Sequence, residues 1–276
     1  PEMTLQADIG NIKYRQTFLQ NFKGEFRTKI NHYLYIDDLD FDAAGGHTHI
    51  KGYFNGSDPT HIYFSSTIDT KDIDIDQIFY KFDNFGQDYL LKDNIHGRLT
   101  AKVTSKVRLH TDLVADLKET EAHIEATVRD GSLVNFAPFE MMSSYVGDKD
   151  LNNVQFAEIS NTFDIKNGTI TIPRMEIATT LGYMFISGKK TLDLQMDYII
   201  EVPFKLIKQA TWNMIFKKKK KKDAEEQEVE DEIMRAREDG REVFVKINIT
   251  GTPSDYEIRL GKGKKNRRKR GKLEME

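Results

Sequence analysis

The chain contains no cysteine among its 276 residues. This excludes disulfide bonds, thiolate metal sites and a cysteine nucleophile, and it is consistent with an oxidising compartment. No stretch approaches the roughly 18 apolar residues of a membrane-spanning helix, and nothing resembles a signal peptide. Because the chain begins at Pro1 and not at a methionine, we expect a targeting segment upstream of it.

The common catalytic and nucleotide-binding motifs are missing as well. The sequence has no G-x-S-x-G, H-E-x-x-H or G-x-G-x-x-G. The stretch Gly261–Lys265 superficially resembles a phosphate-binding loop, but it lacks the G-x-x-x-x-G-K-[ST] spacing and no helical pattern follows it. We therefore predict that the protein is not an enzyme and uses no cofactor.

Two groups of possible metal ligands are incomplete. His47 and His49 form an H-x-H pair that could bind zinc from one strand face, but the sequence offers no third ligand. Asp72, Asp74 and Asp76 alternate as in some calcium sites, yet the EF-hand glycine and closing glutamate are absent. We favour polar sheet surface for the histidines and helix capping for the aspartates, and predict no metal site.

The chain does contain long stretches in which apolar and polar residues alternate. From Gly97 to Leu109 this alternation is unbroken, and thirteen residues in a strand would span roughly 43 Å. Ala122–Phe139 repeats the pattern and is predicted to turn at Asp130-Gly131. Gly97–Leu109 is therefore predicted to be a half-buried antiparallel strand with one apolar and one polar, basic face.

Most other elements are predicted to be strands too. The apolar content of 38% and charged content of 31% suit a soluble chain, and its net charge of −3 excludes little because the charges are clustered. Strands are expected at Val154–Ile165, Thr169–Ile177, Tyr183–Ser187 and Thr191–Val202, and amphipathic helices at Ile73–Phe85, Ala137–Val146 and Leu206–Phe216.

The fold class predicted from these patterns is mainly β, with a long curved antiparallel sheet that forms a hydrophobic groove and a few short helices. We expect the groove domain over residues 1–216 and a charged helical insertion over residues 217–240. Closing strands of the same domain would occupy residues 241–260, and residues 261–276 would be a basic, disordered tail.

Five segments give the chain a family resemblance. In order they are IHGRLTAKV, ATVRDGSLVNF, FDIKNGTI, ISGKKTLDLQMDYIIEVP and INITGTPSDYEI, from Ile95 to Ile258. This order resembles the C-terminal region of the AsmA family, which includes TamB-like envelope proteins, over roughly the last two-thirds of the chain. The Lys217–Glu232 block departs from the family pattern as an insertion before the final strand.

The resemblance implies a periplasmic protein that is anchored in the inner membrane upstream of this chain. It implies a bridge-like β-groove that carries phospholipid toward the outer membrane, with phospholipid acyl chains and envelope proteins as partners. The candidate groove lining is Leu99, Ala101, Val103, Val107, Leu109, Ile124, Ala126 and Val128. A closed sandwich core would use the same residues.

The basic tail offers a second candidate surface. Contact with anionic surfaces, such as lipid head groups, is assigned to Lys264, Lys265, Arg267, Arg268, Lys269 and Arg270. A solubilising role explains these residues equally well, and nucleic acid is not expected because the tail has no aromatic residue for stacking.

Two other functions remain open. The chain could be a structural or assembly factor that docks partner proteins by strand addition at a sheet edge. It could also be a carbohydrate-binding or carbohydrate-processing β protein that uses its many Asp and Tyr residues. Co-purified phospholipid, a stoichiometric protein partner, or sugar binding with an apposed carboxylate pair would distinguish these possibilities.

Overall fold

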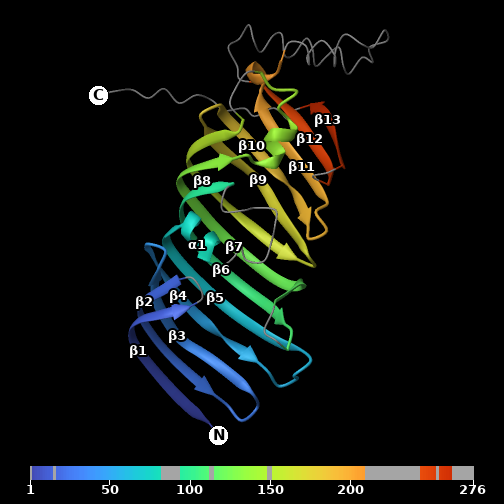
Figure 1. The fold of residues 1–276 in the computed structure, drawn as a ribbon. Helices are drawn as coiled ribbons and strands as arrows, with labels where there is room; N and C mark the ends of the chain where they lie inside the picture. Colours follow the sequence, from blue (N-terminus) through green and yellow to red (C-terminus); the bar gives the residue numbers. More distant parts are fainter. Residues whose placement is uncertain are drawn as a thin grey trace, which may run out of the picture.

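A computed structural model describes residues 2–14, 17–81, 94–111, 115–147, 151–208, 243–252 and 255–262. These residues form one sheet of 13 antiparallel strands, and each strand is hydrogen-bonded to the next in chain order (Figure 1). The sheet is thus one long meander, which agrees with the alternating sequence patterns. The predicted class, a mainly β fold with a long curved antiparallel sheet and a few short helices, is confirmed.

The strands are long for a globular protein. Their bounds are β1 Met3–Tyr14, β2 Thr17–Thr28, β3 Tyr33–Ala43, β4 Gly46–Asn55, β5 Ile62–Asp74, β6 Ile95–Leu109, β7 Ala115–Val134, β8 Asn153–Lys166, β9 Thr169–Thr179, β10 Gly182–Thr191, β11 Met196–Pro203, β12 Phe244–Thr252 and β13 Asp255–Lys262. The short helices are α1 Ile75–Lys81, α2 Ala137–Met141 and the 3-10 turn η2 Phe204–Leu206.

The predicted turn at Asp130-Gly131 is wrong, because β7 continues through it. The strand instead has a bulge there, with two residues of β7 opposite the single residue Gly97 of β6. Asp130 has a φ of 50°, and a Cβ on Gly131 would lie 2.4 Å from the carbonyl oxygen of His96. The Asp-Gly pair therefore supplies the left-handed conformation and the close approach that a bulge requires.

Helix α1 begins two residues later than predicted. The expected helix Ile73–Phe85 begins at Ile75, and its residues 82–85 lie outside the described residues. Asp74 caps it, since its carboxylate accepts a hydrogen bond of 3.0 Å from the backbone N–H of Gln77. A cap was predicted at Asp72 or Asp74, and the structure has it at Asp74, whereas Asp72 lies within β5.

The other two predicted helices also differ. The helix expected over Ala137–Val146 ends at Met141 as α2. At the start of the helix expected over Leu206–Phe216, Leu206 ends the 3-10 turn and Ile207 forms an isolated bridge with Val146. The rest of that prediction, from residue 209, lies outside the described residues.

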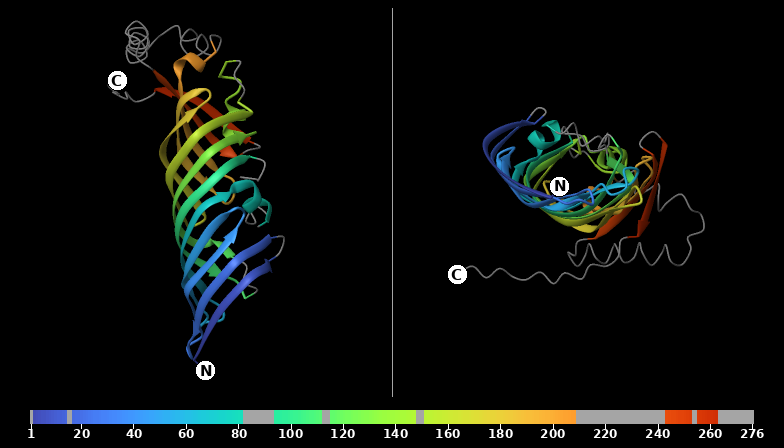
Figure 2. Two further views of the ribbon diagram at one scale, coloured as in Figure 1. Left: turned by 90° about the vertical axis from the view of Figure 1, so that its left-hand side faces the viewer. Right: turned by 90° about the horizontal axis from the view of Figure 1, so that it is seen from below.

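The sheet curls about its long axis into a trough (Figure 2). We call its concave side the inner face and its convex side the outer face. Helices α1 and α2 lie on the inner side of the trough in both views of Figure 2. Right-handed strand twist, summed over many strands, produces this coiling.

The core is concentrated in the C-terminal half of the trough. There Phe139 and Met142 of the α2 region pack with residues of β9 to β12, and Ile177, Ile200 and Ile247 have no exposed surface. This end of the trough is filled by protein and is dry. Exposed large apolar side chains of the described residues occur in both halves. Met3, Leu5, Ile9, Phe18, Ile30 and Tyr53 lie in the N-terminal strands and turns, and Tyr183, Leu194 and Tyr256 lie in the C-terminal half.

Candidate binding groove

The inner face of the central strands carries a continuous row of large apolar side chains. Neighbours in this row are paired directly across adjacent strands from β3 to β8. The members are Leu39, Ile50, Ile68, Val103, Ile124 and Phe163, and we call them the apolar row. At ~4.8 Å between strands, its five steps extend about 24 Å, which is comparable with an extended acyl chain of roughly 20 Å.

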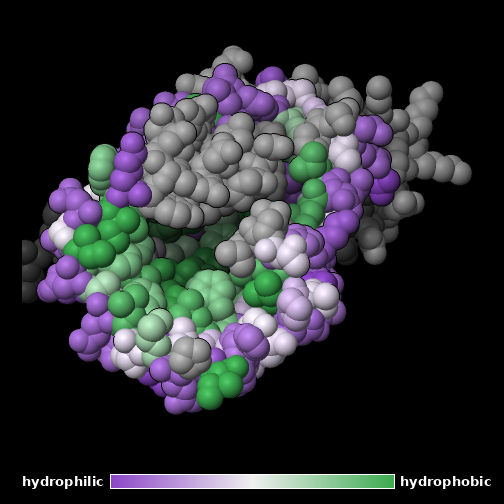
Figure 3. All heavy atoms as spheres, turned by 60° about the horizontal axis from the view of Figure 1, so that its bottom comes forward, coloured by the Kyte–Doolittle hydropathy of each residue, from purple (hydrophilic) through white to green (hydrophobic). Residues whose placement is uncertain are grey.

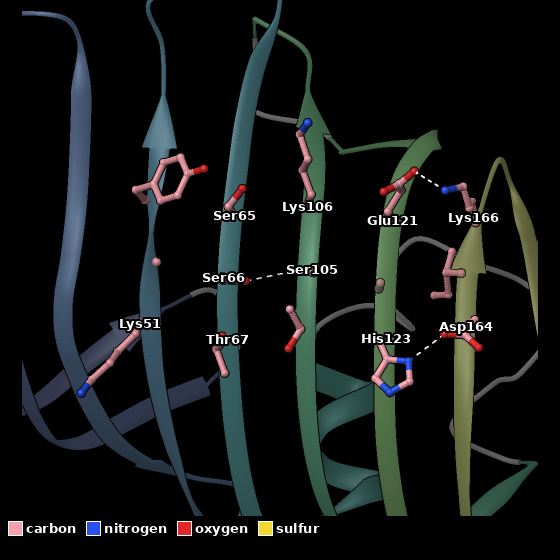
Figure 4. A pocket seen from close by; sticks show the side chains of 15 residues that line it. Lys51, Ser65, Ser66, Thr67, Ser105, Lys106, Glu121, His123, Asp164 and Lys166 are labelled. Carbon is pink, nitrogen blue, oxygen red and sulfur yellow. Dashed lines mark hydrogen bonds and ion pairs between the residues drawn. The ribbon is translucent and has the colours of Figure 1, made fainter.

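A row of small residues runs beside the apolar row. Gly52, Ser66, Ser105 and Ala122 are paired in register across β4 to β7. The hydroxyl oxygens of Ser66 and Ser105 lie 2.9 Å apart and are hydrogen-bonded to each other (Figure 4). Each hydroxyl thus has a hydrogen-bond partner within the row, and the small side chains add depth to the trough.

A row of aromatic and aliphatic residues lies on the far side of the small row. Phe54 pairs with Phe64, and Phe64 pairs with Val107. The two phenyl rings are stacked with centroids 4.3 Å apart. The inner face thus has apolar side chains on both sides of a strip of small side chains. A space-filling view shows an apolar hollow at the end of the molecule where the N-terminal strands lie (Figure 3).

All eight predicted lining residues lie on the inner face, but their exposure differs. Ala101, Leu109 and Val128 are 8% exposed and count as buried. The half-buried members are Leu99, Val103, Val107, Ile124 and Ala126. Leu99 and Val128 belong to the packed core, whereas Val103, Val107 and Ile124 lie outside it.

The outer face of β7 and β8 carries cross-strand ion pairs. Across β7 and β8, Lys166 lies 3.0 Å from Glu121, and His123 lies 2.7 Å from Asp164 (Figure 4). A shallow depression over β4 to β8 is lined by these side chains, by Lys51 and other polar residues, and by the members of the small row, Gly52, Ser66, Ser105 and Ala122.

Much of the groove was not identified from the sequence. The predicted lining came from β6 and β7 alone, whereas Leu39, Ile50, Ile68 and Phe163 come from four other strands. The available signal was the alternation within each segment, but only strand register shows that these residues join. The tail candidates Lys264, Lys265, Arg267, Arg268, Lys269 and Arg270 lie outside the described residues.

Comparison with protein-family models, curated proteins and solved structures finds no match for this chain. Within the described ranges, no helix combines the length and apolarity needed to cross a membrane.

Proposed function

We propose that the inner face binds lipid acyl chains and performs no covalent chemistry. The observation that carries this proposal is the apolar row across β3 to β8, whose members Val103 and Ile124 are only half-buried and lie outside the packed core. A soluble domain normally covers such a surface, and an apolar ligand can supply the cover.

The energetics favour a flexible apolar chain as the occupant. Each methylene transferred from water to an apolar surface contributes about 0.8 kcal/mol. A row of about 24 Å at ~4.8 Å per strand would contact most of one acyl chain along its length. The polar groups of the small row, the hydroxyls of Ser66 and Ser105, are hydrogen-bonded to each other.

The resemblance to the AsmA family extends this proposal to transport. In that setting the chain would be part of a periplasmic bridge, held at the inner membrane by an upstream anchor, that passes phospholipid toward the outer membrane. An open trough supports transfer because a ligand can slide across successive strands. In the same proposal, the basic tail would contact anionic lipid head groups and envelope proteins would be partners of the chain.

Site-specific photo-crosslinking tests lipid binding. A photoreactive residue at Val103 or Val107 is expected to capture phospholipid in cells. The same residue at Lys102 is expected to capture little, since alternate side chains leave the sheet on opposite faces. Mass spectrometry of the crosslinked protein is the measurement.

The matched positions decide the outcome, because Lys102 and Val103 are neighbours in one strand and share the same local backbone. Equal capture at both positions, or capture at neither with folded protein, would contradict a lipid groove on the inner face.

A second candidate function is docking of a partner strand at β1. This strand ends the sheet order, so its outer edge has no strand partner within the described part of the chain. Met3, Leu5 and Ile9 on it are 59%, 55% and 43% exposed. A long edge with exposed apolar residues can accept an added strand. A stoichiometric partner protein together with a lipid-free groove would favour this function.

A further inference from the structure

Two histidines and three aspartates meet on the outer face of β3 and β4. Register pairs Asp40 with His49 and Asp42 with His47, and a register shift between Ile36 and Leu39 precedes them. The residues alternate along both strands, so their side chains project from the same face. None of them lines the groove.

The imidazoles converge on a single carboxylate. His49 Nδ1 lies 2.9 Å and His47 Nε2 lies 3.1 Å from Oδ1 of Asp40. The second nitrogen of His49 lies 3.6 Å from Oδ1 of Asp38. Single ligand atoms of Asp38, Asp40 and His49 all lie within 4.8 Å of one another.

His47 is held by a further carboxylate. Its Nδ1 lies 2.8 Å from Oδ1 of Asp42, which in turn accepts a 2.7 Å hydrogen bond from Asn21 at its other oxygen. This contact turns Nε2 of His47 toward Asp40. A carboxylate that orients a histidine in this way is the usual second layer of a zinc site.

The donor set selects the kind of cation. Calcium and magnesium prefer oxygen ligands alone, whereas zinc and neighbouring transition metals accept imidazole nitrogen together with carboxylate oxygen. Tetrahedral zinc with bonds of about 2.0 Å places its ligand atoms ~3.3 Å apart. The distances of 2.9 and 3.1 Å to Asp40 therefore need only to open slightly around an ion.

We propose that His49, Asp40 and Asp38 bind a divalent transition-metal ion such as zinc on the outer face, beside His47, whose Nε2 lies 3.1 Å from Oδ1 of Asp40. The ion links β3 to β4 next to the register shift. Lys51, 3.4 Å from Asp38, is the nearby cation that it would have to displace.

Isothermal titration of the metal-free chain with Zn²⁺ tests the proposal. We expect one saturable high-affinity site, and a visible absorption band when Co²⁺ replaces zinc. His49→Ala and Asp40→Asn should each weaken zinc binding at least about tenfold, the loss expected when ligands or their supports are removed. Both variants should keep the β-sheet circular dichroism spectrum.

His123→Ala is the matched control. His123 is also an outer-face histidine paired with a carboxylate, Asp164, but no second histidine shares that carboxylate in the described structure. Its loss should leave zinc affinity unchanged. The absence of a one-to-one zinc complex would overturn the proposal, as would unaltered affinity in folded His49→Ala. Either result would leave the cluster as a hydrogen-bonded link between strands.

Discussion

At the scale of single residues, position along the trough decides what an inner-face side chain does. Val103 is half-buried beside the open hollow, whereas Ile177 has no exposed surface. Both belong to strands with apolar inner faces, and their sequences give no hint of this difference. A new charge can remain partly hydrated at the first position, but not at the second.

We therefore predict that Val103→Glu folds and that Ile177→Glu does not. An unpaired buried charge costs several kcal/mol, which is comparable with the free energy of unfolding of a domain. Thermal melts followed by circular dichroism should show a cooperative transition for Val103→Glu and a lost or strongly lowered one for Ile177→Glu. A Val103→Glu chain that fails to fold would mean that the inner face is closed at this position.

At the scale of elements, a bulge in β5 is held by one arginine. Arg98 of β6 donates hydrogen bonds of 2.9 and 2.7 Å to the carboxylate of Asp72 and one of 3.0 Å to the carbonyl of Gly45. These hydrogen bonds, which we call the Arg98 clamp, join β5 and β6 to the turn between β3 and β4. The hydrogen bond from Arg98 lowers the pKa of Asp72 below its ordinary value of 3.8.

From the Arg98 clamp we predict how the stability of the fold depends on pH. A carboxyl group whose pKa is lowered by folding stabilises the fold above its ordinary pKa, and this contribution is lost as pH falls through the folded pKa. Asp72→Asn should therefore lower the melting temperature slightly at pH 7, and the difference from wild type should vanish toward pH 2. Asparagine tolerates the positive φ of 54° at this position, so the backbone is preserved.

The effect should be small because Asp72 is exposed. Melting curves of both proteins across this pH range provide the measurement. A difference that grows as the pH falls would contradict the assigned role of the Arg98 clamp.

At the scale of the whole molecule, the described residues form a single curved sheet whose buried core cluster lies toward its C-terminal end. The fully buried side chains Phe139 and Met142 of the α2 region close the C-terminal end. No such cluster of fully buried residues includes the apolar row. The described inner face therefore has fully buried side chains at one end and half-buried apolar side chains, such as Val103 and Ile124, in its central strands.

Because the chain has no cysteine, single cysteines can map this division. Cysteines at Ile50, Ile68 and Ile124 should react with a maleimide in the native protein, and phospholipid micelles should slow the reaction. Cysteines at Ile200 and Ile247 should react only after denaturant is added. Equal reactivity at both ends would show that the molecule is not divided in this way.

Some properties were determined by the sequence alone. Alternation with a period of two fixes which side chains of one strand share a face, and this is a local property of extended backbone. The eight candidate residues of β6 and β7 were therefore assigned to one face correctly. A cap for α1 at Asp72 or Asp74 was predicted for the same reason, since a cap acts within a few residues.

Other properties were decided only by the tertiary structure. Cross-strand register is non-local, and bulges shift it by residues that no local pattern marks. This is why Asp130-Gly131 became a bulge instead of a turn, and why the missing partners of His47 and His49 were found on β3. Whether an inner-face residue lines the open trough or the dry core depends on what packs above it. Only the curvature of all thirteen strands and the placement of α2 settle that difference.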